Sequence, residues 1–409
     1  MIVMIWKKST AFIHGVGSER VKLLGFVTIG HFFIHWFQQF YPVALPSLKT
    51  GLGLNDVQVG ALNSARQFTM GALDLPLGML ADAVGRHRAL ILASAIVSMG
   101  AAYLLMGIAP YFFWAIVGSA LVGLGTSLWH PAATASLSNK FPERRATALA
   151  VHGMGATVGD TLTPLGVGFL LVTFPWDTTL QMQIVPALLL GFLVWRGLAG
   201  FFENADSHPS RAGQIREIVN LAKSPLFIWL SVSIGLFQMG RLVVQTFLPI
   251  YLQEHLGYSP LVLGFYIALQ HAMGTVSQPI LGFLSDRFGR KATLFPSFIA
   301  LGVLFALIAV VQPGIQLGLV ISAIGLFFYT LLNVVIATVM DVADPKIQAS
   351  SYGLTSLVTH LVVFPSPMLA GLLVGSYGIG STFWFAGALV ILGAFVLAPL
   401  RLYKGTRKG

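Results

Sequence analysis

The chain has 409 residues, of which 56% are hydrophobic, 9% are charged and none is cysteine. Its mean hydropathy of +0.81 leaves too few polar side chains to cover a water-soluble protein of this length, which excludes a soluble domain. The lack of cysteine excludes disulfides, thiolate metal sites and thiol nucleophiles. The net charge of +10 would indicate a nucleic-acid partner only if the basic residues formed a stripe, which they do not.

Twelve apolar segments follow one another along the chain, and each is predicted to be a membrane-spanning helix. A helix needs about twenty apolar residues to cross a hydrocarbon core about 30 Å thick. The segments are continuously apolar, which favours helices over the alternating strands of a membrane barrel. They cover residues 23–46, 57–81, 89–108, 111–138, 145–172, 183–202, 226–252, 261–285, 292–311, 315–340, 349–374 and 380–400.

The longest polar stretch divides these spans into two groups of six. Because the number of spans is even, both termini lie on one side, and nearly all of the 24 Lys and Arg residues fall there. Such a bias is typical of cytoplasmic loops, so we expect a multi-pass protein of a bacterial inner (plasma) membrane. The predicted parts are a cytoplasmic N-terminal segment (1–22), an N-terminal bundle (23–202), a cytoplasmic linker (203–224), a C-terminal bundle (225–401) and a cytoplasmic tail (402–409).

Two similar motifs lie 204 residues apart (282 − 78), GMLADAVGRHR from Gly78 and GFLSDRFGRK from Gly282. Such a duplication indicates two related halves around a central site. The motif resembles the loop after the second helix of the major facilitator superfamily, and its copy resembles the loop after the eighth. The resemblance implies an all-α integral membrane protein with twelve transmembrane helices in two pseudo-symmetric six-helix bundles, acting as a monomeric carrier. It also implies cytoplasmic gating contacts for Asp82, Arg86, Asp286 and Arg290.

The first half carries a second, looser resemblance, to the fosmidomycin-resistance type of efflux carrier. It departs from that type at His35 and Ala132, where acidic residues would be expected. Asp160 lies in a glycine-rich helix that resembles a degraded antiporter motif. The matching residues are His31-Phe32-Phe33, Tyr41-Pro42, Leu48-Lys49, Gln58 with Gly60, and Gly123-x-Gly125-x-Ser127-x-x-His130-Pro131.

Charged groups inside the predicted spans are few and mark the candidate site, since each costs at least ~2.5–3.5 kcal/mol in hydrocarbon. Arg66 and Arg241 come from opposite halves, and a guanidinium binds carboxylates and phosphates through two hydrogen bonds, which indicates an anionic substrate. The alternative is a permanent ion pair between Arg66 and Asp160, or a carbonyl partner for Arg241. The other predicted substrate-binding residues are Gln38, Gln245, Gln270, His271 and Asn333.

Asp160, His31, His35 and His360 are predicted proton-coupling groups, because imidazoles and membrane-buried carboxylates can change charge near neutral pH. By depth along the helices, His31, Asp74, His130 and His152 form one tier. His31 and His35 share a helix face and could hold a transition metal, but no cluster of carboxylates or cysteines accompanies them. We therefore predict no metal and no cofactor; the remaining alternative is that the histidines only tie helices together.

The sequence thus predicts a proton-coupled secondary transporter that exports a small organic anion or anionic drug by alternating access. Uptake symport of a carboxylate, a phosphorylated metabolite or a siderophore is the alternative on the same scaffold. A non-transporting membrane receptor or scaffold is the alternative from another class. The chain has no G-x-S-x-G, H-E-x-x-H or Walker motif, which argues against an enzyme. The expected partners are an anionic small molecule, protons and the lipid bilayer.

Overall fold

The computed structural model describes residues 17–83, 87–201, 219–342 and 348–402, and these residues form helices and no strand. The first half contains α2 (Ser18–Leu52), α3 (Asp56–Ala83), α4 (Arg88–Ile108), α5 (Phe112–Lys140), η2 (Pro142–Arg144), α6 (Arg145–Thr173), α7 (Trp176–Gln181) and α8 (Ile184–Leu198). The second half contains α10 (Pro225–Ile250), the π-helical turn η3 (Tyr251–His255), α11 (Pro260–Phe288), α12 (Arg290–Leu307), α13 (Ile315–Phe328), α14 (Thr330–Val342), α15 (Gln348–Val363), α16 (Ser366–Tyr377) and α17 (Gly380–Leu397).

Each predicted span coincides with one helix or with two successive helices, which confirms the all-α membrane fold. The pairs are α13 with α14 and α15 with α16. The span predicted at 183–202 coincides with α8 alone, and the short helix α7 before it, which forms one apolar segment with α8, lies outside that prediction. In the last pair the break falls at Pro365, which has no amide hydrogen to continue the helix. Within the described residues, nine segments are long and apolar enough to cross a membrane. The predicted spans outside those nine, α2, α3 and α11, carry many of the polar side chains of the site.

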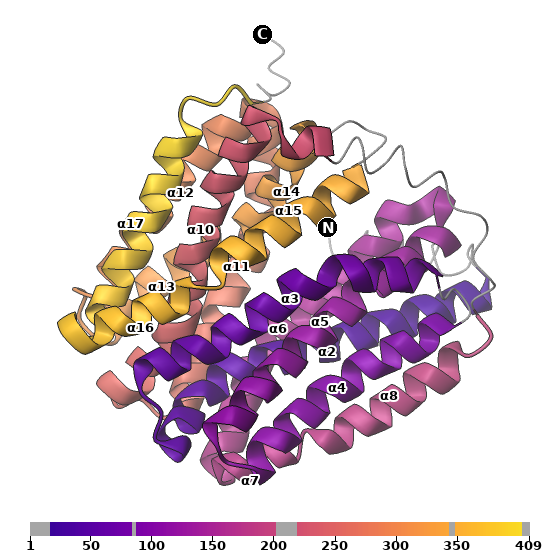
Figure 1. The fold of residues 1–409 in the computed structure, drawn as a ribbon, viewed down its shortest axis with the longest axis horizontal. Coiled ribbons are helices and arrows are strands. Elements are labelled where there is room, and N and C mark those ends of the chain that lie inside the picture. The colour runs from indigo at the N-terminus through magenta and orange to yellow at the C-terminus, as the bar shows by residue number, and fades with distance from the viewer. Residues whose placement is uncertain (1–16, 84–86, 202–218, 343–347, 403–409) are drawn as a thin grey trace.

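The helices form two bundles that lie side by side, with the indigo-to-magenta first half at the lower right and the rose-to-yellow second half at the upper left (Figure 1). In the first bundle α2 packs against α6, and α5 packs against both α3 and α4. In the second bundle α17 packs against α10 and α12. The bundles meet mainly where α6 contacts α11 and where α3 contacts α15 and α16.

Two close backbone approaches between the bundles repeat the internal duplication. A Cβ atom added to Gly60 on α3 would lie 2.4 Å from the carbonyl oxygen of Pro367, and one added to Gly264 on α11 would lie 2.1 Å from that of Pro164. The two glycines are 204 residues apart (264 − 60) and the two prolines 203 (367 − 164). Both crossings therefore require a residue without a side chain, at equivalent positions of the two halves.

These crossings lie towards the end of the molecule at which α2 and α10 end, which we call the distal end; the opposite end is the proximal end. At the distal end Lys49 of α2 reaches across to the second bundle, where its Nζ lies 2.6 Å from Glu254 Oε2. The same ammonium lies 2.8 Å from Asp56 Oδ1 in its own bundle. The distal end is thus closed by both backbone packing and charge.

Candidate functional site

A cavity of about 360 Å³ lies between the two bundles, and side chains of both bundles line it. Its volume falls within the range of pockets that hold small molecules. Arg241, Gln245 and His35 lie on its wall, as do Gln38, Gln39, Ala156, Thr157, Asp160, His271, Thr275, Gln278, Tyr329, Leu332, Asn333 and Ile336.

A smaller cavity of about 50 Å³ also has Arg241 and Gln245 in its wall, together with Gln67, Gln238, Leu242, Thr359, His360 and Val363. It too is lined from both bundles, because Gln67 belongs to α3 and the other residues to α10 and α15. Arg241 is therefore a residue shared by both cavities.

Arg241 is a buried cation held by aromatic rings. Its Cζ lies 4.3 Å from the ring centre of Phe328 and 5.6 Å from that of Tyr329. It donates a hydrogen bond to Gln238 Oε1, while its Nε is buried without a hydrogen-bond partner. Across the described part of the chain, no carboxylate lies within ion-pair distance of this guanidinium. The rings partly offset the cost of burying the charge, and the remaining donors are available to an anion.

Arg66 has a different environment from Arg241, although both were predicted to bind substrate. It is buried, its Cζ lies 5.5 Å from the ring centre of Tyr41, and it lines neither cavity. In the described part of the chain it does not form the alternative ion pair with Asp160, because that carboxylate is bound by other groups. Arg66 thus lies behind the wall of the cavities.

Asp160 connects side chains of both bundles. Its Oδ1 accepts hydrogen bonds from His35 Nδ1 at 2.7 Å and from Gln39 Nε2 at 2.9 Å. Its Oδ2 lies 4.0 Å from Nδ1 of His271 on α11, and the other nitrogen of His271 is hydrogen-bonded to the Tyr329 hydroxyl at 2.7 Å. A continuous polar chain therefore runs along the cavity wall from the first bundle to the second.

A second polar link, between Asp74 and His360, also joins the bundles. Asp74 accepts hydrogen bonds from Ser127 of α5 at 2.5 Å and from Ser356 of α15 at 2.9 Å. His360 Nδ1 donates to the Ser356 carbonyl oxygen at 2.8 Å and lies 3.7 Å from Asp74 Oδ2. His360 thus faces a carboxylate of the first bundle while it lines the smaller cavity.

Three histidines gather inside the first bundle, beside the larger cavity. The ring centres of His31 and His35 lie 4.7 Å apart, and that of His130 lies 5.4 Å from His31 and 5.9 Å from His35. His152 stacks on His31 at 3.9 Å. Depth along the helices predicted one tier for His31, His130 and His152, and the structure brings these rings together with His35.

The other predicted residues fall into three groups. Gln38, Gln245, His271 and Asn333 line the larger cavity, whereas Gln270 is buried and lines neither cavity. Arg290 binds Asp286 at 2.6 Å and Asp341 at 2.7 Å, contacts that stay within the second bundle. The side chain of Asp82 and the whole of Arg86 lie outside the described residues, as do most of segment 1–22, most of linker 203–224 and nearly all of tail 402–409.

Sequence reasoning missed five polar residues of the cavity walls, Gln238, Thr157, Thr275, Gln278 and Thr359. Helix periodicity carries a signal for four of them. Thr157 lies three residues before Asp160, and Thr275 and Gln278 lie four and seven residues after His271, so each shares a face with a residue that was selected. Gln238 likewise lies three residues before Arg241, whose guanidinium donates a hydrogen bond to it.

Comparison with known proteins identifies the family to which the chain is similar. The model of the Major Facilitator Superfamily matches it over two overlapping stretches, residues 27–367 and 230–408. A probable sulfoacetate transporter, SauU of Cupriavidus necator, is 26% identical over 92% of this chain and 94% of its own length. The cis,cis-muconate transport protein of Acinetobacter baylyi is 24% identical over 84% of this chain and 85% of its own.

The chain is also similar to another transporter and to a solved transporter structure. Multidrug resistance protein MdtG of Citrobacter koseri is 26% identical over 80% of this chain and 81% of its own length. A bacterial homologue of the human lysosomal transporter Spinster, in its inward-facing and occupied conformation, has a TM-score of 0.76 at 17% identity, over 94% of this chain and 97% of its own. This last likeness concerns the fold.

Proposed function

Because this chain belongs to the Major Facilitator Superfamily, we propose that it carries a small organic anion across the membrane and that Arg241 binds the anion's acidic group. Its relatives are transporters and not enzymes. The observation that carries the proposal is the buried guanidinium of Arg241, which lines both cavities and has no ion-paired carboxylate among the described residues.

Electrostatics favours an anion over a neutral or cationic cargo at this position. A cation and an anion 4 Å apart attract by about 4 kcal/mol at the effective dielectric constant of a protein surface region, and an approaching cation would be repelled by as much. Gln238 and Gln245 lie beside the guanidinium and can hydrogen-bond the rest of the acidic group. The cargoes named for two relatives, sulfoacetate and muconate, are organic anions, in agreement with this chemistry.

Coupling to protons through His360 and Asp74 is the second part of the proposal. The charged groups that face His360 are Asp74 and Arg66 from α3 and Arg241 across the smaller cavity. On the neighbouring helix α14, the acidic residue Asp341 forms an ion pair with Arg290. A proton on His360 would add positive charge beside Arg241, so the proton and the anion would strengthen each other's binding.

Mutual strengthening favours transport of proton and anion in the same direction, which makes uptake the first candidate. Export, which would need the two to compete, is the second candidate. Two observations favour export: the first half resembles an efflux carrier, and the chain is similar to a multidrug resistance protein. The two candidates share the site and differ in whether proton and anion strengthen each other's binding or compete.

Proteoliposomes with an imposed pH gradient test the proposal. Sulfoacetate and muconate are the probes, with an uncharged ester of each as the comparison. Accumulation in an alkaline lumen supports uptake symport, accumulation in an acidic lumen supports export, and an unchanged rate contradicts proton coupling. Transport of the esters at the rate of the acids contradicts the anion site.

Two variants test the role of His360 in the same assay. His360→Gln should remove the pH dependence of transport. Arg196 is an exposed residue of α8, so Arg196→Gln is the control and should leave both the rate and its pH dependence unchanged.

A further inference from the structure

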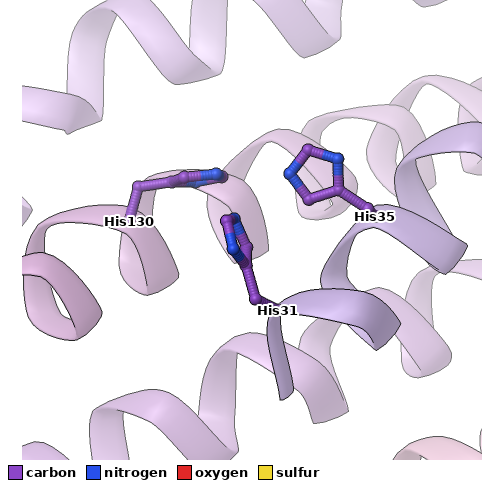
Figure 2. Close-up of side chains that lie close together, drawn as sticks. All are labelled: His31, His35 and His130. Atoms are coloured by element: carbon purple, nitrogen blue, oxygen red, sulfur yellow. The ribbon is translucent and has the colours of Figure 1, made fainter. Parts of the chain in front are cut away.

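The cluster of His31, His35 and His130 combines side chains of two helices at one point. Figure 2 shows the three rings directed towards a common space, His31 and His35 from α2 and His130 from α5. One ring nitrogen of each histidine lies within 4.8 Å of one ring nitrogen of both others. The sequence predicted no metal here because no carboxylate or cysteine cluster accompanies His31 and His35; the fold supplies a third histidine from another helix.

The hydrogen bonds of these histidines determine which nitrogen remains available. Nδ1 of His31 lies 3.0 Å from the carbonyl oxygen of His152, and Nδ1 of His130 lies 2.9 Å from that of Thr126. A carbonyl oxygen only accepts hydrogen bonds, so both Nδ1 atoms carry the proton. His35 Nδ1 likewise donates to the Asp160 carboxylate at 2.7 Å. In all three neutral rings Nε2 is therefore the atom with a free lone pair.

His31 supplies an independent observation that points to a ligand. Its side chain is buried, with 7% of its surface exposed, and its Nε2 has no hydrogen-bond partner. Three imidazoles whose Nδ1–H groups donate to carbonyl or carboxylate oxygens are arranged as metal-binding histidines usually are, because the second hydrogen bond fixes the tautomer and the ring orientation.

We propose that His31, His35 and His130 bind one divalent transition-metal ion of the zinc class through their Nε2 atoms. Tetrahedral coordination at 2.0–2.1 Å requires nitrogens about 3.4 Å apart, and one ring nitrogen of each histidine already lies within 4.8 Å of the others, so binding requires the rings to move closer together. An all-imidazole set suits zinc, cobalt or nickel and does not suit magnesium or calcium, which prefer oxygen ligands. Three protein ligands leave a fourth position for water.

Asp160 acts as a positioning residue of this site. Its carboxylate holds His35 by hydrogen bond and places one negative charge next to the ion, which reduces the cost of burying two positive charges. The proposal replaces the proton-coupling role that the sequence predicted for His31 and His35. It does not depend on anion transport, since Arg241 takes no part in the cluster.

Cobalt(II) is a suitable probe, because tetrahedral cobalt absorbs visible light. Protein purified without a histidine tag and stripped with a chelator is titrated with cobalt, and then with zinc as the competitor. We expect one cobalt per chain and displacement by zinc. His31→Gln and His130→Gln should weaken binding at least about 100-fold, and Asp160→Asn about 10–100-fold. His255→Gln, at the distal end, is the matched control and should bind like the wild type.

Several results would overturn the metal site. Wild-type protein that develops no tetrahedral cobalt spectrum overturns it without any variant, so misfolding of a variant cannot hide the answer. Unchanged affinity in both His31→Gln and His130→Gln overturns it as well. Arg241→Gln separates the two proposals: it should keep cobalt binding while anion binding is lost, and joint loss of both in a folded protein would contradict an independent site.

Discussion

The two bundles share their packing and differ in their chemistry. Gly60 and Gly264 make equivalent crossings against equivalent prolines, so the duplicated backbone contacts have been kept. The charged residues have not been kept. The position in the second half equivalent to Arg66 is Gln270 (66 + 204), and the position in the first half equivalent to Arg241 is Phe37 (241 − 204). The first bundle holds the histidine cluster and Asp160, and the second supplies Arg241. A symmetric frame thus carries an asymmetric site.

The largest expected effect separates the two buried arginines. Arg241→Gln should lower anion affinity by about 2–5 kcal/mol, or about 30-fold or more, because it removes a desolvated cation from the cavity wall. Arg66→Gln should change anion affinity much less, since Arg66 lines neither cavity. The measurement is the shift in thermal stability of each purified variant in a sulfoacetate titration. Equal losses in the two variants would restore Arg66 as a substrate ligand and contradict the asymmetry.

The fold was predictable from the sequence because a bilayer sets the length and polarity of each span. The position of a residue along its helix follows from the sequence as well, since a helix rises by a constant amount per residue. What the sequence lacks is the rotation of each helix about its axis. Arg66 and Arg241 have similar predicted depths, yet one lies behind the wall and the other in it. The contact between His130 and His31 also depends on how α5 and α2 are rotated about their axes. It therefore becomes visible only from the packing of these two helices in the structure.

The shared packing gives the next prediction, in which the two halves should respond alike. Gly60→Ala and Gly264→Ala should each destabilise the protein by about 1–3 kcal/mol, because the new methyl group meets a backbone oxygen that cannot turn away. Gly375→Ala on α16 has open space around it and serves as the control. Thermal unfolding in detergent measures the loss. A strong effect in one half alone would mean that the crossings are not equivalent.

The smallest effect concerns the charged contact that closes the distal end. Burial opposes the charge on Lys49, but the Asp56 and Glu254 carboxylates outweigh it and raise the pKa of this ammonium above 10.5. Because the pKa of Lys49 is higher in the folded than in the unfolded protein, the ammonium stabilises the fold fully at any pH below its unfolded-state pKa. This stabilisation is lost only as the pH rises through the folded-state pKa. Between pH 6 and 9 the contact should therefore be constant, and pH dependence of transport in that range must arise elsewhere, for which His360 is the proposed group.

Lys49→Gln should favour opening of the distal end by about 1 kcal/mol, the size of a partly exposed ion pair. Because the natural chain has no cysteine, spin labels at Thr50→Cys and His255→Cys report the distance between the ends of α2 and η3 without background. The variant should populate longer distances than the wild type, to the same extent at pH 6 and pH 9. A pH-dependent distance in the wild type would show that the distal contact itself titrates, and the proton-coupling role would then move from His360 to this end of the molecule.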